Sequence, residues 1–443
     1  MMSASRGSIS GPRRRRWSYR LCRRVTSMVG LVLVSAAVLG APVVLGRESR
    51  RIGAESQLAE DPAIRPFEIA IDDDVLTDLR ERLLKARMPD EPEGVGWALG
   101  MNQRYLTQLV AYWRDEFDWF AQQRRLNQWD HFTTDIDGLE IHFIHQRSPE
   151  PGAFPLILTP GWPGTFAEFS KVIGPLTDPV AYGGRAQDAF HLVIPSIPGY
   201  GFSERPPRLG YGRERTAAIF ATLMARLGYE RYGAQGGDLG AGISRQLAID
   251  DADRVAGLHL NLCAADPPDP NDPTEGVPPA EVALMEERAA FWTDEERGYS
   301  HMHGTKPQTL GYSLNDSPVG LAAWIVEKYR SWCDCDGNPE TKFSKDELLT
   351  TLTIYWVTET ATSAARYYYE GRHSSTPPSR QRVEVPTACA AFPGEFRFTP
   401  RRWLEARYNL TRFTMMPSGG HFAASEEPEL YVDDLRAFFR SVR

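Results

Sequence analysis

The chain has 443 residues, of which 42% are hydrophobic and 24% are charged, a composition that is ordinary for a soluble globular protein. Its formal net charge is −8, but residues 1–51 carry eleven Arg and one Glu, a balance of +10, so −18 remains for the rest. An acidic body excludes nucleic acid as the expected partner, and the length allows one large domain with insertions or two domains.

The N-terminal end combines a basic segment, 1–24, with an uncharged run at 25–46 that is rich in Val, Leu, Ala and Gly. About 20 apolar residues can span a bilayer as a helix, and the preceding Arg excess directs the following chain away from the cytoplasm. A cleaved signal peptide has the same order of parts. We therefore expect a membrane anchor, or export after signal cleavage, followed by a polar linker at 47–63.

Two amphipathic helices are predicted in the next region, 64–131. The first begins where Asp72 and Asp73 can cap it, and Pro89 stops it. The second covers 103–122, with its apolar residues on one face. These helices predict an N-terminal helical layer that packs on a later core.

The hydrophobic period then changes from helical to alternating. Alternation around Asp137-Gly138 predicts a hairpin over 132–145. Short apolar runs follow, at 155–158, 192–194, 255–262, 387–392 and 411–416, with helical stretches between several of them. The order predicts an α/β fold, with a mostly parallel sheet and helices on both faces.

A long insertion at 267–382 interrupts this alternation and divides the core into 132–266 and 383–443. It begins as a proline-rich loop and continues with helical stretches at 282–292, 321–332 and 345–369. Because sites in open α/β sheets lie at the carboxyl ends of the strands, we interpret the insertion as a helical lid over such a site.

Cys333-Asp334-Cys335 could bind a metal only with a second His or Cys pair, and no such pair stands nearby. We interpret these cysteines as thiols in a polar loop, and we predict neither a metal nor a cofactor.

The strongest local motif is Gly236-Gly237-Asp238-Leu239-Gly240, between a short strand near 231–235 and a helix. It matches the nucleophile-elbow pattern Gly-x-Nuc-x-Gly, although Asp238 could also be an ordinary helix N-cap. An ionised carboxylate needs no base to attack a saturated carbon, and the resulting ester can be hydrolysed, whereas a serine would form a stable ether. Asp238 therefore indicates substitution at an epoxide or a carbon–halogen bond.

The loop 159–164 directly follows a predicted strand. In a fold with this elbow, that loop and the residue after the nucleophile supply the two backbone N–H groups that stabilise an oxyanion. The predicted donors are Trp162 and Leu239.

The base and its partner are predicted from chain order. His421 stands after the last strand and before the final helix, where this fold keeps its base. Glu395 follows the strand 387–392, between the nucleophile and the base, so it is the predicted acid member. Other carboxylates in this part of the chain are less well placed, namely Glu384, Glu405, Glu426 and Glu427.

On these residues the chain resembles the microsomal-type epoxide hydrolases, a family that includes juvenile-hormone epoxide hydrolases and many bacterial members. The resemblance covers about 64–443 and includes the segments 112–119, 298–301, 314–321 and 419–424. It implies an α/β-hydrolase fold, a small and apolar epoxide as substrate, and hydrolysis to a vicinal diol without a cofactor.

By that resemblance, Asp238 is the nucleophile, His421 the base and Glu395 the acid that orients it. The family also uses two lid tyrosines as proton donors to the epoxide oxygen. They match Tyr299 and Tyr368 here, although the match within Tyr367-Tyr368-Tyr369 leaves the register open by one residue.

The chain departs from the family pattern at two positions. Pro160 stands where the family usually has His, and Leu239 stands where it often has Trp. Haloalkane dehalogenases use such a Trp as a halide ligand, so its absence disfavours that activity. The alternative enzyme is a dehalogenase-like or ester hydrolase of the same fold. The alternative without catalysis is a membrane-tethered binding or scaffold protein. A homodimer is a possible assembly of the chain.

Overall fold

The computed structural model describes residues 61–375 and 380–443 of this protein. The predicted basic segment 1–24, the apolar segment 25–46 and nearly all of the linker 47–63 lie outside these residues. Within the described part of the chain, no helix is both long enough and apolar enough to cross a membrane. The chain divides into two units, Met1–Ser56 and Gln57–Arg443, and the fold below is that of the second.

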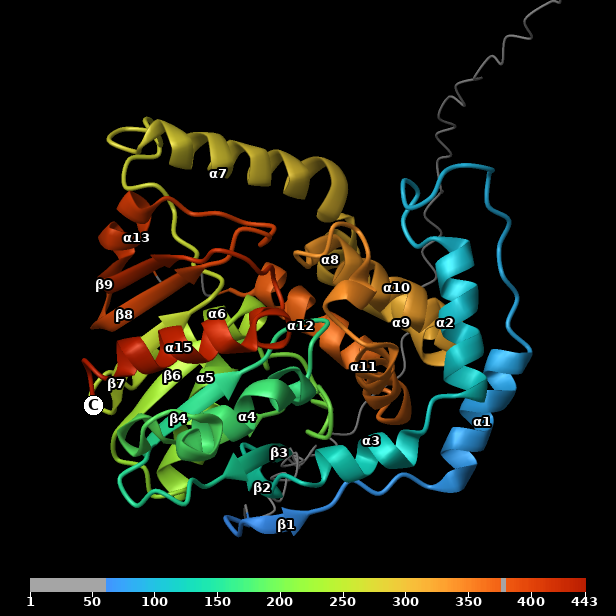
Figure 1. The fold of residues 1–443 in the computed structure, drawn as a ribbon, viewed down its shortest axis with the longest axis horizontal. Helices are drawn as coiled ribbons and strands as arrows, with labels where there is room; N and C mark the ends of the chain where they lie inside the picture. Colours follow the sequence, from blue (N-terminus) through green and yellow to red (C-terminus); the bar gives the residue numbers. More distant parts are fainter. Residues whose placement is uncertain (1–60, 376–379) are drawn as a thin grey trace, which may run out of the picture. The chain divides into compact units, whose positions relative to one another are not determined.

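A nine-stranded sheet forms the centre of this unit, with the order β1-β2-β3-β5-β4-β6-β7-β8-β9 (Figure 1). Pairing is antiparallel from β1 to β5 and parallel from β5 to β9. The predicted, mostly parallel α/β sheet is therefore confirmed. The strands are β1 Arg65–Phe67, β2 His131–Ile136, β3 Leu139–Gln146, β4 Phe154–Thr159, β5 Phe190–Pro195, β6 Tyr232–Gly236, β7 Val255–Leu260, β8 Val383–Ala391 and β9 Tyr408–Met415.

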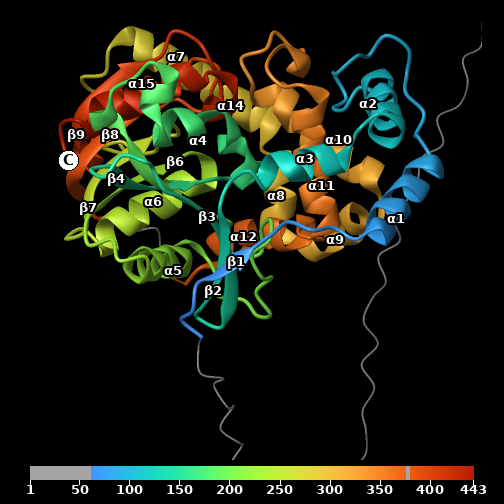
Figure 2. The same cartoon turned by 60° about the horizontal axis from the view of Figure 1, so that its bottom comes forward.

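Helices cover both faces of the sheet (Figure 2). The first face carries α4 (Ser170–Thr177), α14 (Ala423–Glu426) and α15 (Pro428–Phe439), and the other carries α5 (Arg213–Arg226) and α6 (Asp238–Asp250). The central strands are almost wholly apolar because both of their faces are buried, as in Phe154–Thr159. Two hydrophobic clusters result, one on each face of the sheet.

The predicted insertion between β7 and β8 is helical. It contains α7 Pro279–Phe291, α8 Gly298–Thr305, α9 Pro307–Asp316, α10 Pro318–Trp332, α11 Lys345–Val357 and α12 Ala361–His373. The stretch 345–369, which we predicted as one helix, is two helices, because Glu359 adopts a left-handed conformation with φ 53° and ends the first. Helices α8 and α9 lie within the predicted helical lid but were not predicted individually.

The N-terminal helices are α1 Asp73–Leu84, α2 Gln103–Asp115 and α3 Trp119–Leu126. The single helix predicted over 103–122 is wrong, because the Asp118 side chain accepts a hydrogen bond from Ala121 N and starts a new helix there. These helices pack mainly on the lid rather than on the sheet. One such contact is the hydrogen bond from Trp113 Nε1 to Thr353 Oγ1, at 3.1 Å.

The interpretation of Cys333 and Cys335 as thiols is wrong, because the structure joins them in a disulfide. A second disulfide joins Cys263, just after β7, to Cys389 in the neighbouring strand β8, with 6.0 Å between their Cα atoms. Sheet pairing brings this pair together over 126 residues of sequence, which spacing in the sequence does not indicate.

Candidate active site

The nucleophile candidate, Asp238, stands at a sharp turn between β6 and α6, with φ at 45° in the left-handed region. Glycines on either side make the turn sterically feasible. A Cβ atom at Gly236 would overlap the carbonyl oxygen of Gly240, and one at Gly240 would overlap that of Thr159. The local geometry is the strained strand–turn–helix of a nucleophile elbow.

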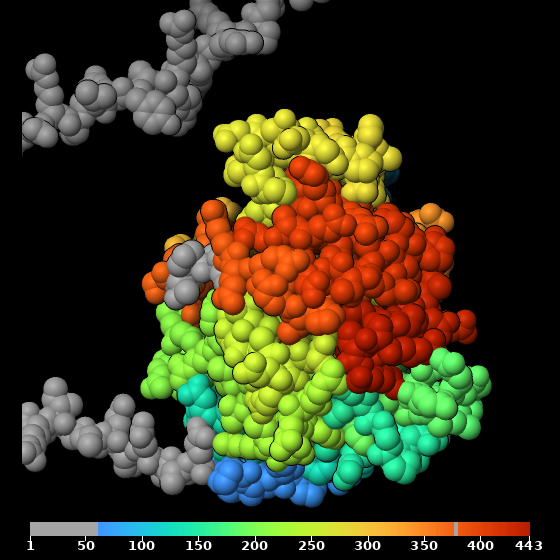
Figure 3. Space-filling view, turned by 90° about the vertical axis from the view of Figure 1, so that its left-hand side faces the viewer, coloured from blue at the N-terminus to red at the C-terminus, as the bar shows by residue number. Residues whose placement is uncertain are grey.

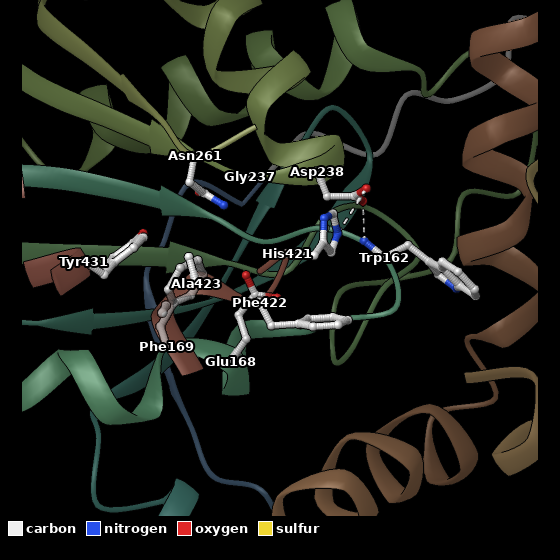
Figure 4. Close-up of a pocket in the computed structure, with 13 residues that line it drawn as sticks. Trp162, Glu168, Phe169, Gly237, Asp238, Asn261, His421, Phe422, Ala423 and Tyr431 are labelled. Atoms are coloured by element: carbon white, nitrogen blue, oxygen red, sulfur yellow. Dashed lines mark hydrogen bonds and ion pairs between the residues drawn. The ribbon is translucent and has the colours of Figure 1, made fainter. Parts of the chain in front are cut away.

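Asp238 is the first residue of α6, and the residue at the N-cap position is Gly237. The Oδ1 of Asp238 accepts a hydrogen bond from the backbone N–H of Trp162 at 2.7 Å, and α6 has no side-chain N-cap bond (Figure 4). Burial raises the pKa of Asp238, while the charge of His421 and the N–H groups of Trp162 and Leu239 act against that rise. The ordinary N-cap alternative therefore does not describe this residue, and both predicted N–H donors act on its carboxylate.

The predicted base faces the nucleophile. His421 Nε2 lies 3.6 Å from Asp238 Oδ2, and its Nδ1 lies 2.9 Å and 3.0 Å from the two carboxylate oxygens of Glu395. All three side chains are at most 11% exposed. Burial lowers the pKa of His421, but the charge and hydrogen bond of Glu395, aided by Asp238 and Glu168, outweigh it and raise that pKa to about 9.

Glu426 has a different role from Glu395. Its carboxylate accepts hydrogen bonds from the backbone N–H groups of Asp334, Gly420 and Phe422, at 2.8–2.9 Å. Burial raises the pKa of Glu426 to about 7, although these three hydrogen bonds oppose the rise. Glu426 thus fixes the loop that presents His421.

The two lid tyrosines lie together above the nucleophile loop, at the contact between α8 and α12. The hydroxyl oxygens of Tyr299 and Tyr368 are 3.4 Å apart, and the Tyr299 ring stacks on Trp162 with centroids 4.7 Å apart. Tyr367 packs on Tyr200 instead. The structure therefore selects Tyr368 from the three consecutive tyrosines. Burial, followed by neighbouring charges that include Asp238, raises the pKa of both phenols, so they are protonated at neutral pH.

Trp332, at the end of α10, connects the lid to the base. Its carbonyl oxygen accepts the backbone N–H of His421 at 2.9 Å, and its ring contacts the imidazole. Its own indole N–H donates to Glu296 at 2.7 Å, and Lys328 forms an ion pair with the same Glu296 oxygen at 2.7 Å. Lid and base therefore share one buried polar network.

Sequence reasoning missed two residues at this site, the half-buried Glu168 and the fully buried His303. Glu168 lines a cavity of about 20 Å³ together with Asp238 and His421, and burial raises its pKa to about 8 (Figure 4). A charged residue inside the apolar run Phe166–Phe169 was an available signal for it. His303 contacts the rings of Tyr299 and Tyr368, and burial lowers its pKa to about 3. A lone His on a helix gives no comparable signal.

No three His, Cys, Asp or Glu side chains are grouped to hold a metal ion within residues 61–375 and 380–443.

Two family models match this chain. The model described as the N terminus of epoxide hydrolases matches residues 64–169, and the model of the alpha/beta hydrolase fold matches residues 155–294.

Curated proteins and solved structures show the same likeness over most of the chain. A putative epoxide hydrolase of Stigmatella aurantiaca (strain DW4/3-1) is 43% identical over 86% of this chain and 86% of that protein. Epoxide hydrolase 1 of Sus scrofa is 41% identical over 87% of this chain and 90% of that protein. The crystal structure of juvenile hormone epoxide hydrolase from the silkworm Bombyx mori is similar with a TM-score of 0.79 and 33% identity, over 87% of this chain and 96% of that chain.

Proposed function

The chain belongs to the microsomal epoxide hydrolase family, and from this premise we propose how its residues convert an epoxide and water to a vicinal diol. Epoxide hydrolysis is the activity of the family. The assignment of steps to residues is our proposal, and the carboxylate of Asp238, held by the Trp162 N–H and facing His421, is the observation that carries it.

In the first step Asp238 opens the epoxide ring. Its Oδ1 is engaged by the Trp162 N–H, so Oδ2 is the oxygen that attacks a ring carbon. The carbon–oxygen bond breaks, and the oxygen that leaves takes a proton from Tyr299 or Tyr368, whose raised pKa values keep both phenols protonated. The result is an ester between Asp238 and the substrate, with the first hydroxyl of the diol in place.

In the second step a water attacks the carbonyl carbon of the ester. The cavity of about 20 Å³ between Asp238, His421 and Glu168 has room for about one water. His421 takes the proton of that water, and Glu395 stabilises the imidazolium that forms. The N–H groups of Trp162 and Leu239 stabilise the oxyanion. When the intermediate collapses, the leaving oxygen takes the second proton of the added water, which releases the diol and restores the Asp238 carboxylate. The imidazolium returns its proton to the tyrosinate through solvent.

Esterification itself prepares His421 for this role. The charge of Asp238 is one cause of the raised pKa of His421 in the free enzyme, about 9. That charge disappears when the ester forms, so the pKa of His421 falls and the neutral imidazole becomes available as a base.

The aromatic surroundings of Asp238 support an apolar epoxide as substrate. Trp162, Tyr299 and Tyr368 contact one another beside the nucleophile loop, and Trp292 stacks on Phe396 in the adjoining groove. Such surfaces favour aromatic or aliphatic groups.

Single turnover in oxygen-18-labelled water tests the ester mechanism. With enzyme in excess over a small neutral epoxide such as styrene oxide, the first diol should lack the label, because the carboxylate supplies its new oxygen. Later turnovers should carry the label as it exchanges into Asp238. A heavily labelled first product would exclude the ester, and Asp238→Ala should abolish turnover of the same epoxide.

We also propose that residues 25–46 attach the enzyme to a membrane, or direct its export and are then removed. The basic segment before an uncharged run of bilayer-spanning length supports this proposal. Membrane fractionation and N-terminal sequencing of the protein from expressing cells distinguish an anchored chain from a cleaved one. A full-length chain in the soluble cytoplasmic fraction would contradict both forms.

A further inference from the structure

One face of helix α6 forms the floor of a groove that begins at the nucleophile. Asp238, Ala241, Gly242 and Arg245 all line this groove. Their spacing of three, four and seven residues places them on one side of the helix. Seven residues along a helix span about 10 Å, so Arg245 leaves the helix about that far along its axis from Asp238.

The walls of the groove are largely apolar, and its volume is about 820 Å³, enough for a substrate of drug size. Helix α7 contributes Met285 and Ala289, Trp292 directly follows this helix, and the loop after β8 contributes Phe396 and Phe398. Figure 3 shows α7, in yellow, lying across the C-terminal elements, in red, on this side of the molecule. The small residues Ala241 and Gly242 keep the floor between the two ends flat.

Three arginines, Arg245, Arg213 and Arg407, line the groove. The guanidinium of Arg245 lies 5.7 Å from the ring centre of Tyr408, and Arg213, beside Gly242, is 3.9 Å from Glu214. Arg407 is 3.5 Å from Asp266, a carboxylate that is 73% exposed. Arg245 donates to the carbonyl oxygen of Gln381 at 2.7 Å, and no carboxylate in the described part of the chain forms an ion pair with it.

These arginines repel one another. Burial lowers the pKa of Arg245, and the charges of Arg407 and Arg213 lower it further, although Tyr408 acts in the opposite direction. Holding three cations together in a half-buried groove costs free energy, which a bound anion would offset. The concentration of positive charge is local, since the chain from residue 52 onward carries −18 in total.

We propose that this groove selects epoxides that carry a carboxylate at the far end of an aliphatic chain or ring system long enough to reach from Asp238 to Arg245, which are about 10 Å apart along the helix axis. The epoxide lies at Asp238, the apolar part lies on Ala241, Gly242 and Trp292, and the carboxylate binds Arg245. The planar guanidinium offers a carboxylate two parallel N–H donors, a geometry that lysine lacks. This inference rests on the proposed function, because it assigns the substrate class of the same site.

A series of epoxy carboxylic acids of increasing chain length, each paired with its methyl ester, tests the proposal, with styrene oxide as a small neutral reference. A charge-assisted hydrogen bond contributes about 1.5–3 kcal/mol, so kcat/KM for the acid of matching length should exceed that of its ester by about tenfold to a hundredfold. Acids that are too short to reach Arg245 should show no such preference. The preference should also decrease as salt is added, because the groove is open to solvent.

Arg245→Met should lower the ratio of kcat/KM for acid over ester by about tenfold or more, because the side chain keeps an unbranched apolar stem but loses the guanidinium and its charge. The matched control is Arg402→Met, on the exposed side of α13 (Arg401–Arg407), where the arginine lies 3.9 Å from Glu275 and outside the groove. This control should keep the acid preference of the wild type. Thermal unfolding of both variants separates a binding effect from a folding defect.

Two results would overturn the inference. The first is wild-type turnover of styrene oxide without a preference for an acid of any length. The second is a loss in Arg245→Met that is equal for acid and ester, which would indicate a structural role. Failure of the wild type to hydrolyse any epoxide would instead overturn the proposed function, so the two failures are distinguishable.

Discussion

His421 contacts the carboxylates of Glu395 and Asp238, and each of its two nitrogens faces one of them. Nδ1 is bonded to Glu395, which leaves Nε2 to face Asp238 and the small cavity beside Glu168. This division assigns His421 to breakdown of the ester and not to its formation, since Asp238 attacks without a base.

Replacing His421 should therefore trap the ester. In His421→Gln, we expect Asp238 to react once with an epoxide and then to remain esterified, because no base activates the water. Mass spectrometry of the intact protein should show one substrate mass added, and peptide mapping should place it on Asp238. Glu384→Gln, an exposed carboxylate on β8, is the control that should turn over normally. An unmodified His421→Gln protein after prolonged incubation with substrate would contradict this division of roles.

The same histidine predicts how stability depends on pH. Folding raises the pKa of His421 from 6.5 to about 9, so between these values the folded state keeps a proton that the unfolded state releases. The free energy of unfolding therefore falls as pH rises through this range. Urea unfolding at pH 6.5 and pH 9 should show a larger loss in the wild type than in His421→Gln, by roughly 3 kcal/mol at most. If the free energy of unfolding depended on pH equally in the wild type and in His421→Gln, the raised pKa of His421 would be contradicted.

The catalytic candidates that stand directly after a strand, in the chain order typical of this fold, were predictable from the sequence. Asp238, Glu395 and His421 each follow a strand, and the fold brings the carboxyl ends of its strands together. Tyr368 needed a family resemblance, because nothing in three consecutive tyrosines indicates which one faces the site. Glu168 and His303 were not predicted, because their importance depends on burial between elements that are distant in sequence.

At the scale of elements, α8 and α12 bring the two tyrosines together over the nucleophile. Tyr299→Phe and Tyr368→Phe should each slow ester formation roughly tenfold to a hundredfold, because one of two proton donors is lost. Ester formation can be followed in stopped-flow by tryptophan fluorescence, since Trp162 stacks on Tyr299. Tyr367→Phe, next to Tyr368 but packed on Tyr200, is the matched control. If Tyr367→Phe slowed ester formation as much as Tyr368→Phe, the assignment of Tyr368 as the proton donor would be contradicted.

The network between α10 and the segment before α8 predicts a large stability effect. Lys328 and Glu296 are at most 9% exposed, so Lys328→Met leaves a buried carboxylate without its cation and should destabilise the protein by about 3–5 kcal/mol. Adding Glu296→Gln should recover part of that loss. Lys85→Met removes an exposed pair with Glu81 and should cost less than about 1 kcal/mol. Urea unfolding measures all three, and equal effects of Lys328→Met and Lys85→Met would contradict the burial argument.

Element boundaries were less predictable than element types. The helical pattern was correct over 345–369 and over 103–122, yet each stretch contains a break. The breaks depend on one residue each, Glu359 with its left-handed backbone and Asp118 with its capping side chain. Hydrophobic periodicity averages over many residues and does not register such single positions.

At the scale of the whole described unit, a mostly parallel sheet with helices on both faces followed from the alternation of strands and helices. The contact of the N-terminal helices with the lid did not, because an amphipathic pattern shows which face is buried and not what buries it. In the structure α2 packs on α10 and α11, and Trp113 donates to Thr353. The N-terminal helices and the lid are separated in the chain by the strands β2 to β7, yet they pack on each other.

Trp332 links the lid to the base, and this link limits how the lid can change without loss of activity. A lid exchanged between relatives would replace the residue whose carbonyl oxygen and ring both contact His421. The incoming lid must therefore place a carbonyl at the same point, so hybrids in which the end of α10 is displaced should lose activity. Helix α7 has no residue that is fully buried, and it lines the groove without contacting the imidazole. Substitutions in α7 should therefore change which epoxides the protein accepts without disturbing the catalytic residues.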